Sequence, residues 1–276
     1  MSEMIKKPSV IFFDIDGTLV AEDANGTIPE STREAIAETR RRGNLTFINT
    51  GRTVFNVSSR IRELGFDGYI CGCGTYVEYG GRVISENRLD QDFCRKIADI
   101  MKECRVVPVY EDRDGYFFDE ETFSSEILKN FLEVFIDPDI DIRGRIEDDN
   151  FIFDKFVVWM DEKTDVEKYR SVVGKYFDII DRGGGLYENV PLGFSKATGI
   201  RCILDKLGIP LENAYVIGDS MNDLPMFKAV PNSIAMGGAE QVYPYVSYIT
   251  TPLEDDGIAN ALRHFGLIAP QTKSCH

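Results

Sequence analysis

The chain has 276 residues, of which 43% are hydrophobic and 28% charged, and this much apolar material excludes a disordered protein. Asp and Glu outnumber Lys and Arg by 46 to 31, so the formal net charge is −15. So acidic a chain repels nucleic acid and anionic membrane surfaces, and we expect neither as a partner. A phosphorylated substrate would therefore need a local cationic pocket.

The cysteine pattern predicts a cytoplasmic protein. The six cysteines include no Cys-x-x-Cys pair, and the chain has only two His, so a structural zinc site is not expected. A disulfide framework is not expected in a chain of this length, and we predict reduced, mostly buried thiols. The first eight residues lack the apolar stretch of a signal peptide, and no apolar run reaches the ~18 residues of a membrane span.

The first part of the chain predicts strands that alternate with helices. We expect one helix from about Ser31 to Gly43 and another that runs to about Leu64. Short apolar runs, typical of strands covered on both faces, occur at Val10–Phe13, Leu45–Ile48 and Tyr69–Cys71. Alternation of this kind indicates a parallel sheet in a Rossmann-like α/β domain.

The alternation of predicted strands and helices changes between residues 82 and 188. Helical stretches and aromatic strands, such as Gly115–Phe118 and Phe151–Met160, predict an α+β module with an antiparallel sheet. Glycines at 80–81 and 183–185 mark its ends, and we favour a hinge over a substrate loop at 182–185, because glycine permits unusual dihedral angles. From Ser195 a helix runs to Gly208 and strands resume, at 214–217, 233–236 and 246–249. We therefore expect a discontinuous core, residues 1–81 and 189–276, interrupted by an inserted α+β domain, residues 82–188.

Small polar residues end three of the predicted strands. In open parallel sheets, ligands bind beyond the carboxyl ends of the strands, so these loops are expected to meet at one crevice. The three aspartates in them would repel one another unless a cation lay between them, and hard oxygen ligands beside a phosphate favour Mg²⁺. The loops are Asp14-Ile15-Asp16, Asn49-Thr50-Gly51 and Gly218-Asp219.

Two carboxylates two residues apart could take two different catalytic roles. Asp14 could attack phosphorus and form an aspartyl-phosphate, while Asp16 protonates the leaving oxygen and later activates water. An isolated Asp-x-Asp is more often a plain loop or a weak calcium site. The strand before this pair and the turn-forming Gly17-Thr18 after it favour the catalytic interpretation.

Several residues could hold a phosphate. Thr50 and the N–H of Gly51 suit phosphate oxygens, although a threonine there could also simply cap a helix. Lys196 begins a helix, where a cation opposes the helix dipole by several tenths of a kcal/mol, and a bound anion would remove that conflict. A solvated lysine is the alternative. Asn222 and Asp223 could contact phosphate or orient the other groups, and a helix cap would explain only one of them.

Taken in order, these segments resemble the motifs of the haloacid dehalogenase superfamily of aspartyl-phosphate phosphatases. The insertion lies between motifs two and three, so the chain is similar to the Cof-type branch with a large α/β cap. The resemblance spans nearly the whole chain, and four ordered motifs are more specific than any one of them. The four are Asp14–Thr18, Thr50, Lys196 and Gly218–Asp223.

The resemblance implies a Mg²⁺-dependent phosphatase. Asp14 would be nucleophile and metal ligand, Asp16 the acid/base and a ligand through its backbone carbonyl, and Asp219 the third protein ligand. Phosphate would lie against Ile15, Thr50, Gly51, Lys196 and Asn222, with Asp223 in support. The chain departs from the family pattern at Cys71–Thr75, where Asn-Gly-Ala is usual, and at Lys196-Ala197, where Lys-Gly is usual.

These observations favour hydrolysis of a small phosphate monoester, such as a sugar phosphate, with a substrate that the cap domain selects. A phosphomutase on the same scaffold and a non-catalytic protein that binds a phosphorylated metabolite are the alternatives. Neither the physiological substrate nor the oligomeric state follows from the sequence.

Overall fold

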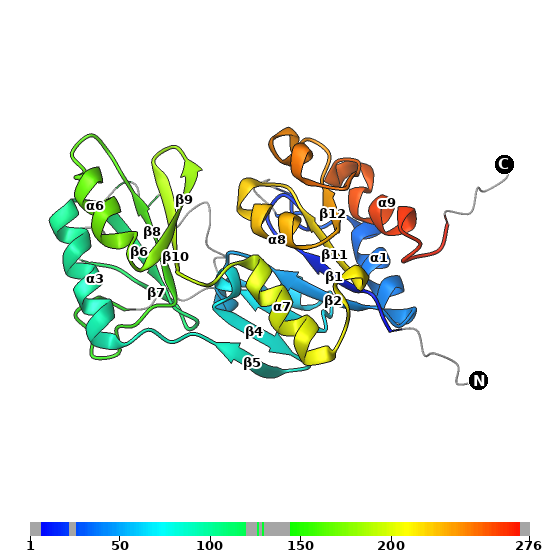
Figure 1. Ribbon diagram of the computed structural model, residues 1–276, viewed down its shortest axis with the longest axis horizontal. Helices are drawn as coiled ribbons and strands as arrows, with labels where there is room; N and C mark the ends of the chain where they lie inside the picture. Colours follow the sequence, from blue (N-terminus) through cyan, green and yellow to red (C-terminus); the bar gives the residue numbers. More distant parts are fainter. Residues whose placement is uncertain (1–6, 22–25, 120–125, 127–128, 130–143, 271–276) are drawn as a thin grey trace.

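The chain forms two sheets, which lie side by side in the computed structural model (Figure 1). The structure describes residues 7–21, 26–119, 126, 129 and 144–270. One sheet has eight strands in the order β13-β12-β11-β1-β2-β3-β4-β5, and the other has five in the order β7-β6-β8-β10-β9. We call the unit around the larger sheet the core domain and the unit around the smaller sheet the cap domain.

The core sheet is parallel from β13 to β3 and ends in an antiparallel hairpin. Its parallel strands are β1 (Val10–Phe13), β2 (Leu45–Asn49), β3 (Gly68–Cys71), β11 (Ala214–Gly218), β12 (Asn232–Ala235) and β13 (Tyr248–Ile249). The hairpin consists of β4 (Tyr76–Tyr79) and β5 (Arg82–Glu86).

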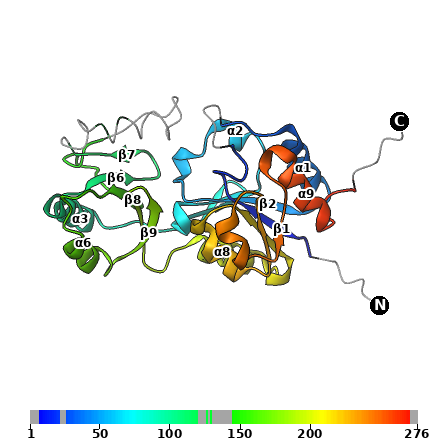
Figure 2. The same cartoon turned by 90° about the horizontal axis from the view of Figure 1, so that it is seen from above.

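Helices cover both faces of the core sheet, which is why its central strands are apolar throughout. Side chains of β1 alternate: Ile11 and Phe13 pack under α1 (Glu30–Arg41) and α9 (Gly257–His264). Val10 and Phe12 pack under α7 (Lys196–Leu207) and α8 (Leu224–Ala229). Figure 2 shows α1 and α9 on one side of β1 and β2, with α8 on the other.

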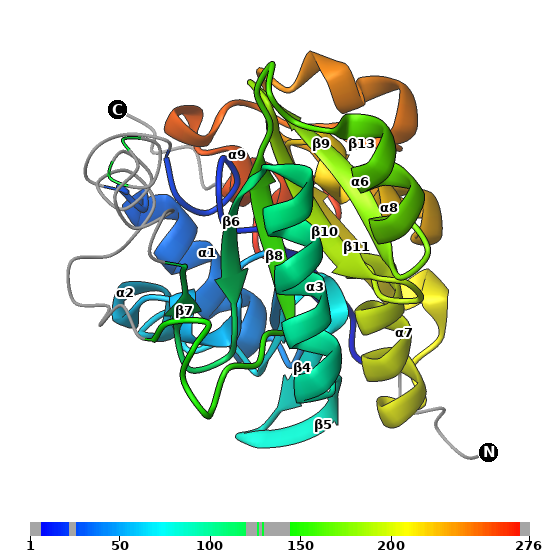
Figure 3. The same cartoon turned by 90° about the vertical axis from the view of Figure 1, so that its left-hand side faces the viewer.

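The cap sheet is antiparallel and has a helical layer on one face. Its strands are β6 (Val107–Glu111), β7 (Tyr116–Phe117), β8 (Lys155–Trp159), β9 (Phe177–Gly183) and β10 (Leu186–Pro191). The helices α3 (Gln91–Cys104) and α6 (Val166–Val173) pack on one face through an aromatic core (Figure 3). The opposite face carries Val109, Tyr116 and Val157, which pack against Phe55 of the core domain.

Short helical turns complete the structure. The one-turn helix α2 (Ser59–Arg62) follows a 3-10 turn, and together they replace the continuous helix expected up to Leu64. The 3-10 turns are Val54–Asn56, Gly72–Gly74, Leu211–Asn213, Met221–Asp223, Glu240–Tyr245 and Leu253–Asp255.

The predicted fold class is confirmed: a parallel-sheet α/β core is interrupted by an α+β unit with an antiparallel sheet. Sheet membership divides the chain a few residues away from the expected limits of 82 and 188. Strand β5 pairs with β4 in the core sheet, and β10 continues in the cap sheet to Pro191. We propose, from these pairings, that the cap domain spans about residues 87–191.

The hinge interpretation of residues 182–185 is wrong. Gly183, Gly184 and Gly185 have φ of 84°, 60° and 83° and form the turn between β9 and β10, inside the cap sheet. Gly80 and Gly81, with φ of 57° and 72°, form the β4–β5 turn in the core sheet. The glycines mark tight hairpins, because left-handed dihedral angles suit such turns, and neither set lies where the chain passes between domains.

Cys71, Cys73, Cys94 and Cys104 are buried free thiols, Cys202 is a half-buried one, and Cys275 lies outside the described residues. Among the helices that the structure describes, none is long and apolar enough to cross a membrane. Most of the polar tail from Ala269 to His276 also falls outside the described residues.

Candidate active site

Asp14 and Asp219 face each other at the carboxyl ends of the adjacent strands β1 and β11. The N–H of Asp14 donates to Ile217 O at 3.0 Å, which extends the β1–β11 ladder by one residue and fixes Asp14 at the sheet edge. Thr18 Oγ1 donates to Asp219 Oδ1 at 3.0 Å. A Cβ on Gly17, whose φ is 71°, would lie 2.4 Å from Asp219 Oδ2, so only glycine allows this approach.

Lys196 is the cation of the site. It is 1% exposed, and its Nζ lies 2.8 Å from Asp14 Oδ1 and 2.5 Å from Asp223 Oδ1. Burial lowers the pKa of Lys196, but the charges of Asp14 and Asp223 outweigh burial and raise it above its usual value. The alternative of a solvated lysine is therefore wrong. The two carboxylates also offset the unfavourable position of this cation at the start of α7.

The carboxylates of Asp14, Asp219 and Asp223 form an acidic cluster, with one oxygen of each within 4.8 Å of the others. Asp223 is already engaged, because its Oδ2 accepts from the N–H groups of Asp219 at 3.0 Å and Ser220 at 3.2 Å and its Oδ1 contacts Lys196. Burial, then the charge of Asp223, raises the pKa of Asp14 to about 7. Burial, then the charge of Asp14, raises the pKa of Asp219 to about 8.

Burial and the repulsion between neighbouring carboxylates thus disfavour the ionised forms of Asp14 and Asp219, even with Lys196 beside Asp14. A divalent cation held by both carboxylates would favour their ionised forms, and oxygen ligands of this kind suit Mg²⁺. The donor set therefore fits the expected metal. Asp223 fits a supporting role, since it holds Lys196 and the backbone of the Asp219 loop.

Asp16 lies apart from this cluster and pairs with Arg52. Its side chain is 51% exposed, and Arg52 donates to it through Nε at 3.0 Å and Nη2 at 2.5 Å. Partial burial of Asp16 raises its pKa. The hydrogen bond and the charge of Arg52 outweigh that effect, so the pKa of Asp16 lies below its usual value. Sequence reasoning missed Arg52, although it directly follows the predicted phosphate residues Thr50 and Gly51.

The loop of Thr50, Gly51 and Arg52 is held by the loop after β3. Thr50 is 1% exposed, its N–H donates to Ile70 O at 2.9 Å, and its Oγ1 accepts from the N–H of Arg52 at 3.1 Å. The N–H of Cys73 donates to Thr50 O at 3.0 Å, and that of Gly72 donates to Arg52 O at 2.7 Å. The Cys71–Thr75 segment, whose role the sequence left open, therefore braces the expected phosphate loop.

Cys73 has φ of 54°, a left-handed conformation that favours glycine or asparagine over cysteine. Its thiol is buried, which raises its pKa above the usual value, so it is not an ionised nucleophile. A Cβ on the next residue, Gly74, would lie 2.5 Å from Ser195 O. The loop thus also supports the start of α7, where Ser195 and Thr198 form a capping box beside Lys196.

The remaining predicted phosphate ligands lie near these groups. The carbonyl of Ile15 accepts from the N–H groups of Leu19 at 2.9 Å and Val20 at 3.0 Å, so the Asp14–Asp16 loop is a tight turn. Asn222 is 8% exposed and its Oδ1 accepts from Ser220 Oγ. It borders a recess of about 230 Å³ between the domains, which Ile180 of the cap domain lines from the other side.

The cap domain places a buried charged group next to the phosphate loop. Lys155 Nζ lies 2.8 Å from Glu111 Oε1 and 2.9 Å from Glu188 Oε1, and Arg182 Nε lies 3.5 Å from Glu188 Oε2. A Cβ on Gly51 would lie 3.1 Å from Glu188 Oε1. Sequence analysis did not identify these glutamates, because strand pairing alone brings them together.

Further contacts hold the cap domain against the core domain. Asn56 Nδ2 donates to the hydroxyl of Tyr116 at 2.9 Å, and the rings of Phe55 and Tyr116 meet edge to face at 4.9 Å. Arg113 of the cap domain pairs with Glu86 at the end of β5 and donates to Asn87 O at 3.1 Å. The structure therefore shows a closed arrangement.

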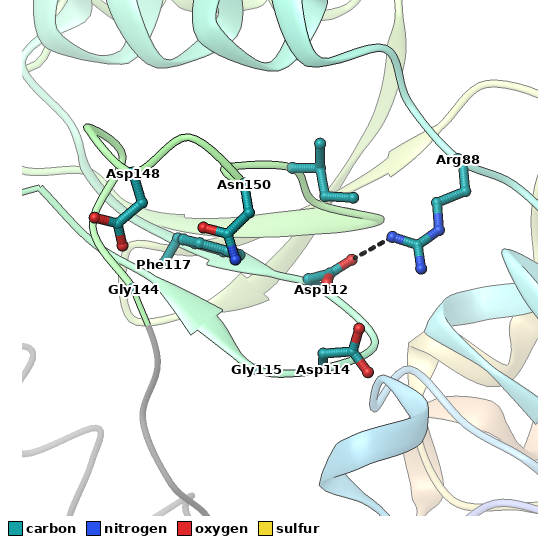
Figure 4. A pocket seen from close by; sticks show the side chains of 9 residues that line it. Arg88, Asp112, Asp114, Gly115, Phe117, Gly144, Asp148 and Asn150 are labelled. Carbon is teal, nitrogen blue, oxygen red and sulfur yellow. Dashed lines mark ion pairs between the residues drawn. The ribbon is translucent and has the colours of Figure 1, made fainter.

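A separate cavity of about 500 Å³ lies in the cap domain, and none of the predicted site residues lines it. Figure 4 shows Arg88 beside Asp112 at one side and Asp148 with Asn150 at the other. Arg88 Nη1 lies 3.7 Å from Asp112 Oδ1. This cavity adds nothing to the site at the core sheet edge.

Comparison with known proteins agrees with this geometry. Residues 11–262 match the family model of the haloacid dehalogenase-like hydrolases. The chain belongs to this family. It is 31% identical over 263 residues to YkrA of Bacillus subtilis (strain 168), whose name gives phosphatase as a provisional assignment, with 94% of this chain and 98% of YkrA covered.

Two further relatives carry more specific names. YcsE of Bacillus subtilis (strain 168), named 5-amino-6-(5-phospho-D-ribitylamino)uracil phosphatase, is 26% identical over 94% of this chain and 96% of its own length. The solved structure of the subclass IIB sugar phosphatase BT4131 is 29% identical, has a TM-score of 0.79, and is covered to 100%, with 94% of this chain matched. This haloacid dehalogenase-like chain is thus a phosphatase by family, and the names of these two relatives refer to small phosphorylated metabolites.

Proposed function

We propose that this haloacid dehalogenase-like phosphatase is Mg²⁺-dependent and hydrolyses small phosphate monoesters, sugar phosphates or related metabolites, through an aspartyl-phosphate on Asp14. The observation that carries the proposal is the position of Asp14, buried at the sheet edge with Lys196 Nζ at 2.8 Å and Asp219 opposite. The names of YcsE and BT4131 support phosphorylated polyols and sugars as the substrate class. We place the protein in the cytoplasm, with no nucleic acid or membrane partner, as its charge and thiols suggest.

In the first step, an oxygen of Asp14 attacks phosphorus, and the bond from phosphorus to the leaving oxygen breaks. Asp16, once it has separated from Arg52 and taken up a proton, gives that proton to the leaving oxygen. Asp16 has to leave Arg52 for this role, because both of its carboxylate oxygens accept from that guanidinium in the structure. In the second step, Asp16 takes a proton from a water that attacks phosphorus, which releases phosphate and restores Asp14.

The metal would be held by the carboxylates of Asp14 and Asp219 and by the backbone carbonyl of Asp16. When bound, Mg²⁺ would neutralise charge on the phosphate and on the two carboxylates. Phosphate oxygens would be held by the backbone at Ile15 and Gly51 and by side chains of Thr50, Lys196 and Asn222. Asp223 would position Lys196 through the 2.5 Å contact.

The test is phosphate release from sugar phosphates, polyol phosphates, nucleotides and an aryl phosphate, measured with Mg²⁺ and with a chelator. We expect release that requires the metal and that Asp14→Asn reduces at least a thousandfold, since the amide cannot serve as the nucleophile. Asp114→Asn, in the separate cap cavity, is the matched control and should leave release unchanged. Interconversion of phosphorylated isomers without net release would indicate a phosphomutase, and metal-dependent binding without turnover would indicate a binding protein.

A further inference from the structure

Glu188 is a buried carboxylate at the junction of the two domains whose hydrogen bonding is incomplete. It is 3% exposed, and its Oε2 accepts no hydrogen bond from any residue that the structure describes. Arg182 Nε lies 3.5 Å from that oxygen, which is long for a hydrogen bond. A buried acceptor without a donor is costly, so this atom is suited to a donor that arrives with a ligand.

The position of Glu188 points to the substrate. Its other oxygen, Oε1, faces the phosphate loop, where a Cβ on Gly51 would lie 3.1 Å away and where Cys73 Sγ donates at 3.6 Å. On the cap sheet, Glu188 stands opposite Ile180, which lines the recess that Asn222 borders. A phosphate held by Gly51 and Asn222 would therefore place its ester group between the phosphate loop and these cap residues.

The charges around Glu188 select a neutral donor. Glu111 and Glu188 are balanced by Lys155 and Arg182, so an additional ammonium group would leave the cluster with excess positive charge. Burial raises the pKa of Glu188, but Lys155 and Arg182 lower it to about 2, so the group is an ionised acceptor at neutral pH. Arg182, with a side chain 32% exposed, offers donors beside that acceptor. A hydroxyl can donate to Glu188 and accept from Arg182 at once.

We infer that Glu188 and Arg182 form a subsite that recognises hydroxyl groups of the leaving group, so that the enzyme prefers phosphates of polyhydroxylated alcohols. This inference rests on the proposed function, since it names the group that the catalytic aspartates release. The subsite lies on the β9–β10 hairpin, which makes residues 182–185 a substrate loop, the interpretation that the glycine pattern had disfavoured.

The experiment compares kcat/KM for glucitol 6-phosphate with kcat/KM for phenyl phosphate, which carries no hydroxyl, in the wild type and in Glu188→Gln. We expect the ratio of the two values to fall at least tenfold, the range for loss of a hydrogen bond to a charged group. Glu111→Gln is the matched control: it also contacts Lys155 at 2.8 Å, but among the described residues it forms no ion pair with Arg182. We expect it to change the ratio less than about twofold.

A ratio unchanged in Glu188→Gln, or changed equally in Glu111→Gln, would overturn the subsite. If Glu188→Gln does not fold, Arg182→Gln on the exposed hairpin makes the same prediction. Failure of the proposed function is a different outcome, because the wild type would then release phosphate from neither compound. A wild type that prefers phenyl phosphate would overturn the subsite and leave the phosphatase intact.

Discussion

Two glutamates that share one lysine have opposite pKa shifts. Glu188 contacts Lys155 and Arg182, and its pKa falls to about 2, although burial opposes the shift. Burial raises the pKa of Glu111 despite the opposing charge of Lys155, so its net shift is upward. Arg182 contacts Glu188 directly, whereas the charge of Glu188 itself helps to raise the pKa of Glu111, so we expect the two positions to respond differently to acid.

For Glu188 the pKa is lower in the folded chain than the ordinary 4.5, so its ionised form stabilises the fold. That contribution is present above pH 4.5 and is lost as pH falls toward about 2. We expect the free energy of unfolding of the wild type to exceed that of Glu188→Gln at pH 6 and the gap to shrink by up to about 2.5 kcal/mol by pH 2.5. Urea unfolding across this range measures the gap.

A gap that stays constant with pH would contradict this assignment. Glu111→Gln is the control because its raised pKa has the opposite sign. A group of that kind stabilises the fold at low pH and loses the contribution as pH rises, so its gap should not shrink on acidification.

Individual residues of the core motifs were predictable because each follows an apolar strand, and the ends of parallel strands meet at one edge. Lys196 shows where this reasoning stops. A solvated lysine and a buried one could not be distinguished from the sequence, since its partners Asp14 and Asp223 are separated from it by 182 and 27 positions. Arg182 and Glu188 were beyond reach for the same reason.

At the scale of elements, helix α7 packs closely on strand β3. A Cβ on Gly199, in this helix, would lie 2.3 Å from Ile70 Cγ2. Alanine in place of glycine favours the helix by about 1 kcal/mol, but overpacking of a core costs about 1–3 kcal/mol. The cost of the close contact therefore exceeds the gain in helix propensity. We expect Gly199→Ala to lower the free energy of unfolding, measured in urea, by about 1–2 kcal/mol.

The same substitution should reverse its effect when Ile70 is truncated. Ile70→Ala alone costs about 2–5 kcal/mol, because it leaves a cavity between β3 and α7. In that background we expect Gly199→Ala to stabilise the protein by up to about 1 kcal/mol. A substitution that destabilises both backgrounds equally would show that the contact with Ile70 is not the cause.

Strand positions were predictable from composition, and the first strand agrees with the sequence expectation to the residue. The glycine-marked boundaries were not, because a glycine run looks the same in a hairpin turn as in a linker. Only pairing partners distinguish the two, and partners such as Tyr187 and Asp181 are set by the sheet.

At the scale of the whole molecule, closure of the cap domain depends on a few polar contacts. We expect Tyr116→Phe, which deprives Asn56 Nδ2 of its 2.9 Å acceptor, to weaken the closed arrangement by about 1 kcal/mol and to favour opening about fivefold. Small-angle scattering without substrate should then give a larger radius of gyration than for the wild type.

The matched control is Tyr169→Phe, which removes a 2.6 Å hydrogen bond to Asn189 inside the cap domain. It should lower the stability of the cap domain without changing the radius of gyration. An equal radius for Tyr116→Phe and the wild type would show that other contacts, such as Arg113 with Glu86, are sufficient for closure.

The insertion has a consequence for how the chain acquires its structure during synthesis. Strand β1 lies at the centre of the core sheet, and its neighbour β11 follows about 200 residues later. At a translation rate of ~5–20 residues per second, one edge of β1 stays unpaired for ~10–40 s until β11 has been synthesised. The cap sheet, whose strands all lie between residues 107 and 191, is complete first. The inserted domain therefore emerges from the ribosome before the sheet that carries the catalytic aspartates can be completed. Partly synthesised chains expose an apolar strand edge that chaperones would recognise.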